Sequence, residues 1–352
     1  MSDAVAATLP WLKAPLRHVL GSSRAHALLV HGPGAVGQFE LAMLLGQAWL
    51  CENDAVPIDS RPCGSCASCR LVMARTHPDL LVVVPEALRE QLGWAVDGED
   101  GTEARSGKKK PSKEIRVDDV RAVVAFASTT SGRGRGKAVV VHPAERMNDI
   151  AGNAFLKTLE EPAGNARFVL STASPASLLP TIRSRCQAVS LPTPPREEAL
   201  AWLRAQGVAV SETLLDAAAG QPQEAADMAA LGIDAAAWRA LPGRVAAGDA
   251  SALRGWALPR VVETLQKLCH DAACVSMGAA PRYFPAASVA GDTPLAGLSA
   301  WSGALTRFAE NDEHPWIVEL SVESLVEQGR RALQKPRIAG HGRGIESIHS
   351  KE

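Results

Sequence analysis

Short apolar runs rich in β-branched residues alternate with helical patterns over the first half of the chain. Near-continuous apolar strands are typical of a parallel sheet covered on both faces, and apolar positions three and four residues apart indicate helices. We therefore predict an α/β domain over residues 1–192. Its expected strands are residues 27–31, 80–84, 137–142, 167–172 and 188–191, and its expected helices are residues 39–50, 117–128 and 150–161.

The pattern changes after the proline-rich residues 192–195. Clustered prolines mark a domain boundary, and helix-length segments rich in Ala, Leu and Glu follow. These segments break at Gly207, at Gly220-Gln221-Pro222 and at Pro242-Gly243. We predict a small helical domain at 193–234, an all-α domain at 235–333 with a low-complexity connection near 278–298, and a disordered tail at 334–352.

One stretch of the first domain, residues 86–112, loses both patterns and is rich in Gly, Asp, Glu and Lys. Such composition favours a mobile surface insertion. Its run of three lysines, residues 108–110, leaves a DNA contact as the alternative.

Composition narrows the class of protein. The chain has 352 residues, a formal net charge of -1, 46% hydrophobic and 21% charged residues, which is typical of a globular protein with several domains. A near-neutral charge argues against a broad, sequence-independent grip on nucleic acid, although a local basic face stays open. With no apolar run of membrane-spanning length and no signal-peptide pattern at the start, we expect a cytoplasmic protein that does not contact a membrane.

A glycine-rich loop follows the first predicted strand. Gly32, Gly34 and Gly37 keep the spacing of the phosphate-binding pattern GxxxxGK[ST] up to its second glycine. In that pattern a Lys reaches the β- and γ-phosphates and a hydroxyl binds Mg²⁺, but here Gln38 and Phe39 take those positions. The backbone pattern indicates a nucleoside triphosphatase, and the side chains indicate one that does not hydrolyse.

A second loss falls at the end of the predicted strand 137–142. Active P-loop enzymes end this strand in acidic residues that hold Mg²⁺ and polarise water, whereas this chain has His142 and Pro143. Glu145 could have a displaced catalytic role, or it could be a capping residue. Because the phosphate end and the metal end are both altered, we expect no intrinsic ATPase activity.

Four cysteines predict a metal site. Cys63, Cys66 and Cys69 follow the C-x2-C spacing, and Cys51 lies shortly upstream within the module 51–69. In a reducing compartment such a cluster indicates metal before disulfide, and four thiolates leave no open position, as in structural zinc sites. An iron–sulfur cluster and free thiols are the alternatives, and His77 could replace Cys51 as the fourth ligand.

Two charged segments complete the set of motifs. Residues 153–162 place Phe155, Leu156 and Leu159 on one helical stripe before Pro162, which an amphipathic helix facing the core explains. Residues 181–186 place Arg183 and Arg185 before the last strand. An arginine there can form a surface salt bridge or bind the phosphates of a neighbour's nucleotide.

Together these features resemble the bacterial clamp-loader subunits of DNA polymerase III, which belong to the AAA+ assemblies. The resemblance rests on the glycine loop, the split cysteine group, Thr76-His77-Pro78-Asp79, residues 155–162 and Ser184-Arg185-Cys186. It covers residues 1 to about 192 well, 193–235 fairly and the rest weakly.

The resemblance implies a role in an assembly. Arg185 matches the arginine finger that completes ATP bound to an adjacent subunit, Thr172 matches the first nucleotide sensor, 193–234 becomes a lid and 235–333 a collar. The implied partners are ATPase motor subunits and the delta subunit, with the sliding clamp and primed DNA reached through the complex, as part of a DNA-directed DNA polymerase holoenzyme. We expect structural Zn²⁺ and no bound ATP. The rival readings are an ATP-hydrolysing motor subunit and a zinc-dependent nucleic-acid module.

Overall fold

The computed structural model describes residues 9–94, 111–208, 212–311 and 316–334. The chain forms two compact units. The first contains Met1–Val210 and Gly220–Asp227, and the second contains Ser211–Ala219 and Met228–Glu352.

The first unit is built on a five-stranded sheet in the order β2-β3-β4-β1-β5. Every pairing in it is parallel, as buried strands joined by helices require. All five residues of β3 are buried. The strands are β1 (Ala27–His31), β2 (Leu80–Val83), β3 (Lys137–Val141), β4 (Ala166–Thr172) and β5 (Gln187–Ser190).

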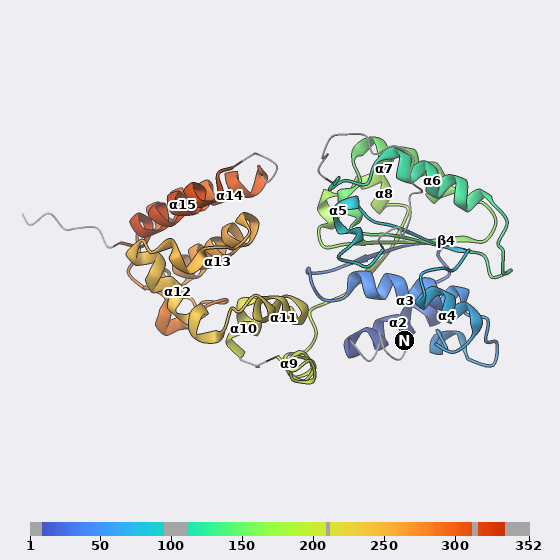
Figure 1. Ribbon diagram of the computed structural model, residues 1–352, viewed down its shortest axis with the longest axis horizontal. Coiled ribbons are helices and arrows are strands. Elements are labelled where there is room, and N and C mark those ends of the chain that lie inside the picture. The colour runs from blue at the N-terminus through green and yellow to red at the C-terminus, as the bar shows by residue number, and fades with distance from the viewer. Residues whose placement is uncertain (1–8, 95–110, 209–211, 312–315, 335–352) are drawn as a thin grey trace, which may run out of the picture. The chain divides into compact units, whose positions relative to one another are not determined.

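Helices cover both faces of this sheet. α2 (Lys13–Ser22), α3 (Gln38–Leu50) and α4 (Ala67–Met73) lie on one face, and α6 (Val117–Ser128) and α7 (Asp149–Glu160) lie on the other (Figure 1). The core between the sheet and α6–α7 includes an edge-to-face pair of Phe155 and Phe168, with ring centroids 5.5 Å apart. The predicted parallel α/β fold is confirmed.

Shorter elements connect these layers. They are the 3₁₀ turns η1 (Pro10–Leu12), η2 (Ile58–Ser60), η3 (Ala144–Arg146) and η4 (Pro175–Ser177), and the helices α5 (Glu86–Arg89), α8 (Pro180–Arg183) and α9 (Arg196–Ala205). α5 lies inside the predicted insertion 86–112, and Ser112 N donates to Glu86 Oε2 at 2.9 Å. Residues 95–110, with the lysine run, lie outside the described residues.

The region after β5 is helical where the structure describes it, as predicted. Its helices are α10 (Glu212–Ala217), α11 (Pro222–Ala230), α12 (Ala235–Ala247), α13 (Leu258–Ser276), α14 (Leu295–Glu310) and α15 (Val318–Leu333), with the short turns η5 (Ala250–Leu253) and η6 (Ala286–Ser288). The boundary between the two units falls inside 193–234. The separation into lid and collar stays a prediction, and the tail beyond residue 334 lies outside the described residues.

One predicted break is wrong, because α12 continues through Pro242 and Gly243. An internal proline removes one backbone hydrogen bond and costs about 3 kcal/mol. Packing on both sides of Pro242 offsets this cost, since Trp238, Leu241 and Val245 are all buried. The Trp238 ring stacks on Phe284 with centroids 4.5 Å apart, and its Nε1 donates to Tyr283 O at 2.9 Å.

A buried carboxylate organises the connection predicted near 278–298. Asp271 on α13 is fully buried. Its oxygens accept the backbone N–H groups of Arg282, Tyr283 and Phe284 at 2.9, 2.7 and 2.8 Å. The aspartate supplies an anionic acceptor for three successive donors, so this segment keeps a defined path without regular secondary structure.

Candidate functional site

The glycine loop joins the end of β1 to the start of α3, and two of its glycines are required by geometry. A Cβ on Gly32 would lie 1.9 Å from Leu191 O. Gly37 has a φ of +98°, the left-handed region that L side chains avoid. Gly34 is less constrained, because the nearest atom to a Cβ there is 3.8 Å away. The predicted phosphate-loop backbone is therefore present.

Gln38 folds back on this loop. Its Nε2 donates to Gly32 O at 3.1 Å and to Pro33 O, and its side chain is only 6% exposed. A P-loop lysine instead extends toward the phosphates. The amide is used to hold the loop's own carbonyl groups, so it is not free to serve a ligand.

Trp11 contacts the glycine loop and packs in turn on Trp202. Trp11 in η1 donates from Nε1 to Val36 O at 2.8 Å, and its ring meets that of Trp202 on α9 edge to face at 5.6 Å. Since Val36 and Gly37 are buried, the second half of the loop is part of the packed interior.

Aromatic packing replaces the metal end of the site. The ring of Phe39 lies 5.0 Å from the ring of His142, and His142 Nδ1 is 2.9 Å from Ser171 Oγ. Burial lowers the pKa of His142 to about 4, so the imidazole is neutral at physiological pH. A phenyl ring packed on a neutral imidazole has no carboxylate with which to hold Mg²⁺, which prefers oxygen ligands.

Glu145 and Thr172 close the end of β4. Glu145 Oε1 accepts Ala173 N at 3.1 Å, and Thr172 Oγ1 accepts Ser174 N at 3.0 Å. The second carboxylate oxygen of Glu145 is buried and has no hydrogen-bond partner among the described residues. Both side chains therefore accept hydrogen bonds from backbone N–H groups, which is a structural contact and involves no ligand.

The shifted pKa of His142 predicts an acid-sensitive stability. The group titrates at about 4 when folded and 6.5 when free, so the unfolded chain binds the proton more readily. Above pH 6.5 His142 is neutral in both the folded and the unfolded chain and does not lower the free energy of unfolding. That free energy falls as the pH drops toward 4, by roughly 2 kcal/mol at pH 5. Urea denaturation of wild type and His142→Asn at pH 7.5 and 5 measures this. A stability difference between the two proteins that does not change with pH would contradict the prediction.

The four predicted cysteines come together. The Sγ atoms of Cys51, Cys63, Cys66 and Cys69 all lie within 4.8 Å of one another, and Cys63 Sγ is 3.9 Å from Cys69 Sγ. Zinc–thiolate bonds of about 2.3 Å in a tetrahedron put sulfurs about 3.8 Å apart. All four are free thiols. The donor set and its spacing fit one tetrahedral zinc ion.

Local backbone groups prepare these thiols unequally. Burial opposes ionisation of Cys63, but the backbone N–H groups of Cys66 and Ser65 lower the pKa of its thiol to about 6. Burial raises the pKa of Cys69 and of Cys51. Cys66 Sγ also accepts Cys69 N at 3.4 Å as the N-cap of α4. The partly exposed thiol of Cys63 thus offers the first anionic ligand to an incoming cation.

His77, the alternative fourth ligand, is engaged elsewhere. Its Nδ1 accepts Asp79 N at 3.0 Å, and its Nε2 lies 2.6 Å from the hydroxyl of Ser68. That hydroxyl donates to Leu50 O at 2.6 Å, next to Cys51. The structure therefore places Cys51, and not His77, in the cluster, while His77 ties the module to the end of α3.

Asp79 has a role that the sequence analysis missed. Its carboxylate is 1% exposed and accepts Ser131 Oγ, Gly132 N and Arg133 N at 2.9, 2.7 and 2.9 Å. Although burial opposes ionisation, these donors hold the pKa of Asp79 below its usual range. The glycine-rich run at 131–136 was the available signal, because its backbone donors need an acceptor.

The same loop reaches the cysteine module through two arginines. Arg133 binds Glu52 with Nε and Nη2 at 2.6 and 3.0 Å, and Arg135 Nη2 binds Asp54 at 2.6 Å. These pairs lower the pKa of Glu52 and of Asp54. The loop before β3 therefore connects the module to the sheet.

Arg185 lies at the junction of α8 and β5, two residues before that strand begins. Its Nε donates to Glu160 Oε1 at 2.5 Å, its Nη2 contacts the same oxygen, and its Nη1 donates to Thr181 O at 2.9 Å. The side chain remains 31% exposed. Both alternatives thus have support within the chain, since a salt bridge is present and the guanidinium still reaches the surface.

The positions of Arg185 and the glycine loop are opposed. β1 and β5 pair in parallel, with Leu28 opposite Gln187 and His31 opposite Ser190. Arg185 precedes the start of β5, while the loop follows the end of β1. The arginine and the loop therefore lie at opposite ends of these two paired strands, at least three residue steps of about 3.3 Å apart.

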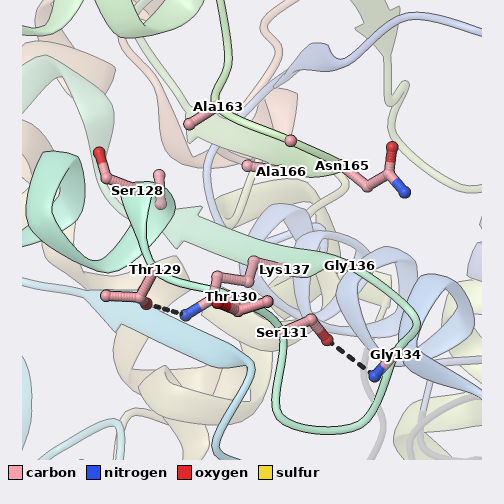
Figure 2. Close-up of a pocket in the computed structure, with 12 residues that line it drawn as sticks. Ser128, Thr129, Thr130, Ser131, Gly134, Gly136, Lys137, Ala163, Asn165 and Ala166 are labelled. Carbon is pink, nitrogen blue, oxygen red and sulfur yellow. Dashed lines mark hydrogen bonds between the residues drawn. The ribbon is translucent and has the colours of Figure 1, made fainter.

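A cavity of about 370 Å³ lies at the edge where β3 and β4 begin. Figure 2 shows the Lys137 amine directed at Thr129, with Ser131 accepting Gly134 N nearby. The ammonium also lies 4.0 Å from the ring centroid of Phe126, and the hydroxyl of Thr129 donates to Phe126 O at 2.8 Å. These groups satisfy one another, and we assign no ligand to this cavity.

The fold and the altered loop define the class as an α/β protein of the P-loop type, and comparison with known proteins identifies its family. The model of the family described as "DNA polymerase III, delta subunit" matches residues 16–195. The chain belongs to this family.

Among the clamp-loader subunits that the sequence resembles, two similar proteins are delta' subunits. DNA polymerase III subunit delta' of Pseudomonas aeruginosa is 37% identical over 195 residues, 55% of this chain and 52% of that protein. The subunit delta' of Escherichia coli K12 is 33% identical over 220 residues, 60% of this chain and 58% of that protein. The matched part of the chain thus spans little more than half the length of these relatives.

A solved structure is also similar. The gamma subunit-related protein of DNA polymerase III from Thermotoga maritima has 17% identity and a TM-score of 0.43, covering 92% of this chain and 99% of that one.

Among the helices in the described ranges, none combines the length and apolar character needed to cross a membrane.

Proposed function

We propose that this chain is a non-hydrolysing stator subunit of the DNA polymerase III clamp loader. In this role it takes part in loading the sliding clamp on primed DNA and presents Arg185 to ATP bound by a neighbouring subunit. Its partners are ATPase motor subunits and the delta subunit, and it contacts the clamp and DNA through the assembly, in the cytoplasm.

The opposed positions of Arg185 and the glycine loop carry this proposal. An arginine before β5 cannot serve a nucleotide beyond the end of β1 in the same chain without spanning the length of the strands, but it can serve a site on another subunit. Arginine stabilises the charge of a transferring phosphoryl group. The sequence resemblance implies an adjacent subunit that binds ATP, and the strand topology supports action of Arg185 on that subunit.

The state of the chain's own loop supports the stator role. The Gln38 amide is bound to Gly32 O and Pro33 O, and Phe39 packs on neutral His142. The positions of Gln38, Phe39, His142 and Pro143 lack the lysine, hydroxyl and strand-end carboxylate that phosphoryl transfer requires, and Glu145 caps Ala173 N. We infer that this subunit holds no catalytic ATP.

Zn²⁺ is the proposed cofactor, held by Cys51, Cys63, Cys66 and Cys69. A four-thiolate site leaves no position for a reacting water, so the ion would shape the module and perform no chemistry. The collar assignment for 235–333 and the lid assignment for 193–234 rest on the family resemblance.

ATP binding and hydrolysis by the isolated chain separate the stator from a motor subunit. We expect no measurable turnover and no tight binding, because the phosphate and metal ends both lack their ligands. The measurement is equilibrium binding of ATP with Mg²⁺ together with phosphate release. Hydrolysis by the purified chain at the rate of a motor subunit would contradict the stator role, and DNA affinity that falls steeply with salt would favour the nucleic-acid module instead.

The arginine finger is tested in the reconstituted loader. Replacing Arg185 by Ala is expected to reduce clamp- and DNA-stimulated ATP turnover. Turnover at the wild-type rate would remove the assignment.

A further inference from the structure

We propose that Glu160 is the positioning residue of the Arg185 finger, and that it stays bound to the guanidinium while the finger acts on a neighbour's nucleotide. This inference rests on the proposed function of Arg185. It concerns a charged residue of the segment 153–162, and the charged residues of that segment have no role assigned above.

The contacts of the guanidinium leave its far end directed away from Glu160. Arginine carries five N–H donors in a planar fork. Nε and one Nη2 hydrogen face Glu160 Oε1, one Nη1 hydrogen faces Thr181 O, and Nη1 also lies 3.5 Å from Ser184 Oγ. The second Nη2 hydrogen has no acceptor among the described residues, and the second Nη1 hydrogen has only this long contact with Ser184. They form the end of the fork, which matches two oxygens of a phosphate.

The carboxylate itself stands on a fixed element. Glu160 is the last residue of α7, and the carbonyl of the preceding Leu159 lies 2.6 Å from His26 Nε2, directly before β1. The side chain of Leu159 is fully buried. The end of α7 is thereby attached to the sheet, so the position of the Glu160 backbone is set by the core.

The arginine is held equally firmly. Arg185 N donates to Ile182 O at 3.1 Å, and the side chains of Ile182 and Cys186 on either side are buried. Catalytic groups act best when their supporting residues are held by packing. The backbones that carry both side chains are therefore held in place, and Glu160 and the carbonyl of Thr181 hold the guanidinium between them.

Glu160 does not stabilise α7 by its charge. The C-terminal end of a helix carries a partial negative charge, and an acidic residue in the last turn is unfavourable. The contact with Arg185 compensates this placement. Its neighbour Glu161 is exposed as well, and it provides a matched control that changes the same charge one residue away.

The test is single-turnover ATP hydrolysis by the reconstituted loader, with clamp and primed DNA, containing wild-type, Glu160→Gln, Glu161→Gln, Arg185→Ala or Glu160→Gln/Arg185→Ala subunits. A misplaced catalytic group loses rate more than binding, so we expect Glu160→Gln to lower the hydrolysis rate constant of the neighbour's site ~10-fold, with the ATP concentration at half-maximal rate unchanged. Glu161→Gln should match wild type. The double variant should be no slower than Arg185→Ala, because residues acting through one contact are not additive.

The outcomes separate the inference from the function on which it rests. Wild-type turnover by Arg185→Ala removes the proposed function. Impaired Arg185→Ala with an intact Glu160→Gln removes the positioning role alone, as does a double variant whose losses multiply. A faster Glu160→Gln loader would show that Glu160 restrains the finger, which also overturns the proposal. Gel filtration of each loader confirms that the variants assemble.

Discussion

Removing the metal from the full chain is expected to unfold the cysteine module. Zinc binding contributes on the order of 10 kcal/mol to the folding of small modules, and the segment around η2 and α4 is too short to replace that with a core of its own. Chelation, or Cys63→Ser, should make the module sensitive to protease. The sheet should persist, because its core between β3, β4, α6 and α7 does not include the cluster.

Elemental analysis and limited proteolysis measure this effect. The purified wild type should carry one zinc per chain, and Cys63→Ser should lose it. Cys274→Ser is the matched control, since Cys274 is a partly exposed free thiol in α13, outside the cluster. A chain that contains no zinc and folds fully in the presence of chelator would contradict the assignment, and bound iron with visible absorption would indicate the iron–sulfur alternative.

The Arg185→Ala substitution is expected to have the second large effect. Characterised arginine fingers contribute about 10³- to 10⁵-fold in rate, roughly 4 to 7 kcal/mol of transition-state stabilisation. The loss should fall on the site of one neighbouring subunit, so total turnover of the loader falls by the share of that site and by its coupling to the others. Single-turnover hydrolysis resolves the affected site from the remainder.

Arg183→Ala is the control for this substitution. Arg183 is the last residue of α8, is exposed, and carries the same charge two positions away. It should leave hydrolysis unchanged. If both variants reduced turnover equally, the effect would come from surface charge and not from a finger.

Strands and long helices were predictable because each depends on local pattern. β1 and α6 have the predicted bounds, and α3 and α7 begin one residue earlier than expected. β5 lies one residue before its predicted place. α2 and α4 were missed, and α4 is a seven-residue helix inside the cysteine module, where Cys66 acts as the cap. Its stability comes from the module and not from periodicity.

The interior of the site depended on contacts that no local pattern contains. The loss of chemistry at Gln38 and His142 could be seen from residue types alone, since neither residue can do the work of the side chain it replaces. The new partners of these side chains could not be seen, because His142 meets Ser171 from another strand. Asp79 joins residues more than fifty positions away, and Glu160 and Arg185 are 25 positions apart.

Tertiary packing also overrode one strong local signal. Pro242 in a sequence stretch normally ends a helix, yet α12 runs on to Ala247. The aromatic stack of Trp238 on Phe284 joins α12 to a segment about 45 residues away. Sequence pattern carries the propensity of the proline but not the free energy of that stack.

The folded-back amide of Gln38 has a thermodynamic consequence for the assembly. A protein that binds a ligand in its native state gains stability by mass action as the ligand concentration rises, and loses it as the ligand is consumed. Under the proposed function this loop, with the Gln38 amide bound to its own carbonyls, binds no nucleotide and takes no part in that exchange. The free energy of unfolding of this subunit would then be the same at high and low ATP. An assembly of subunits that cycle through bound and empty states would contain one member whose conformational ensemble does not follow the cycle.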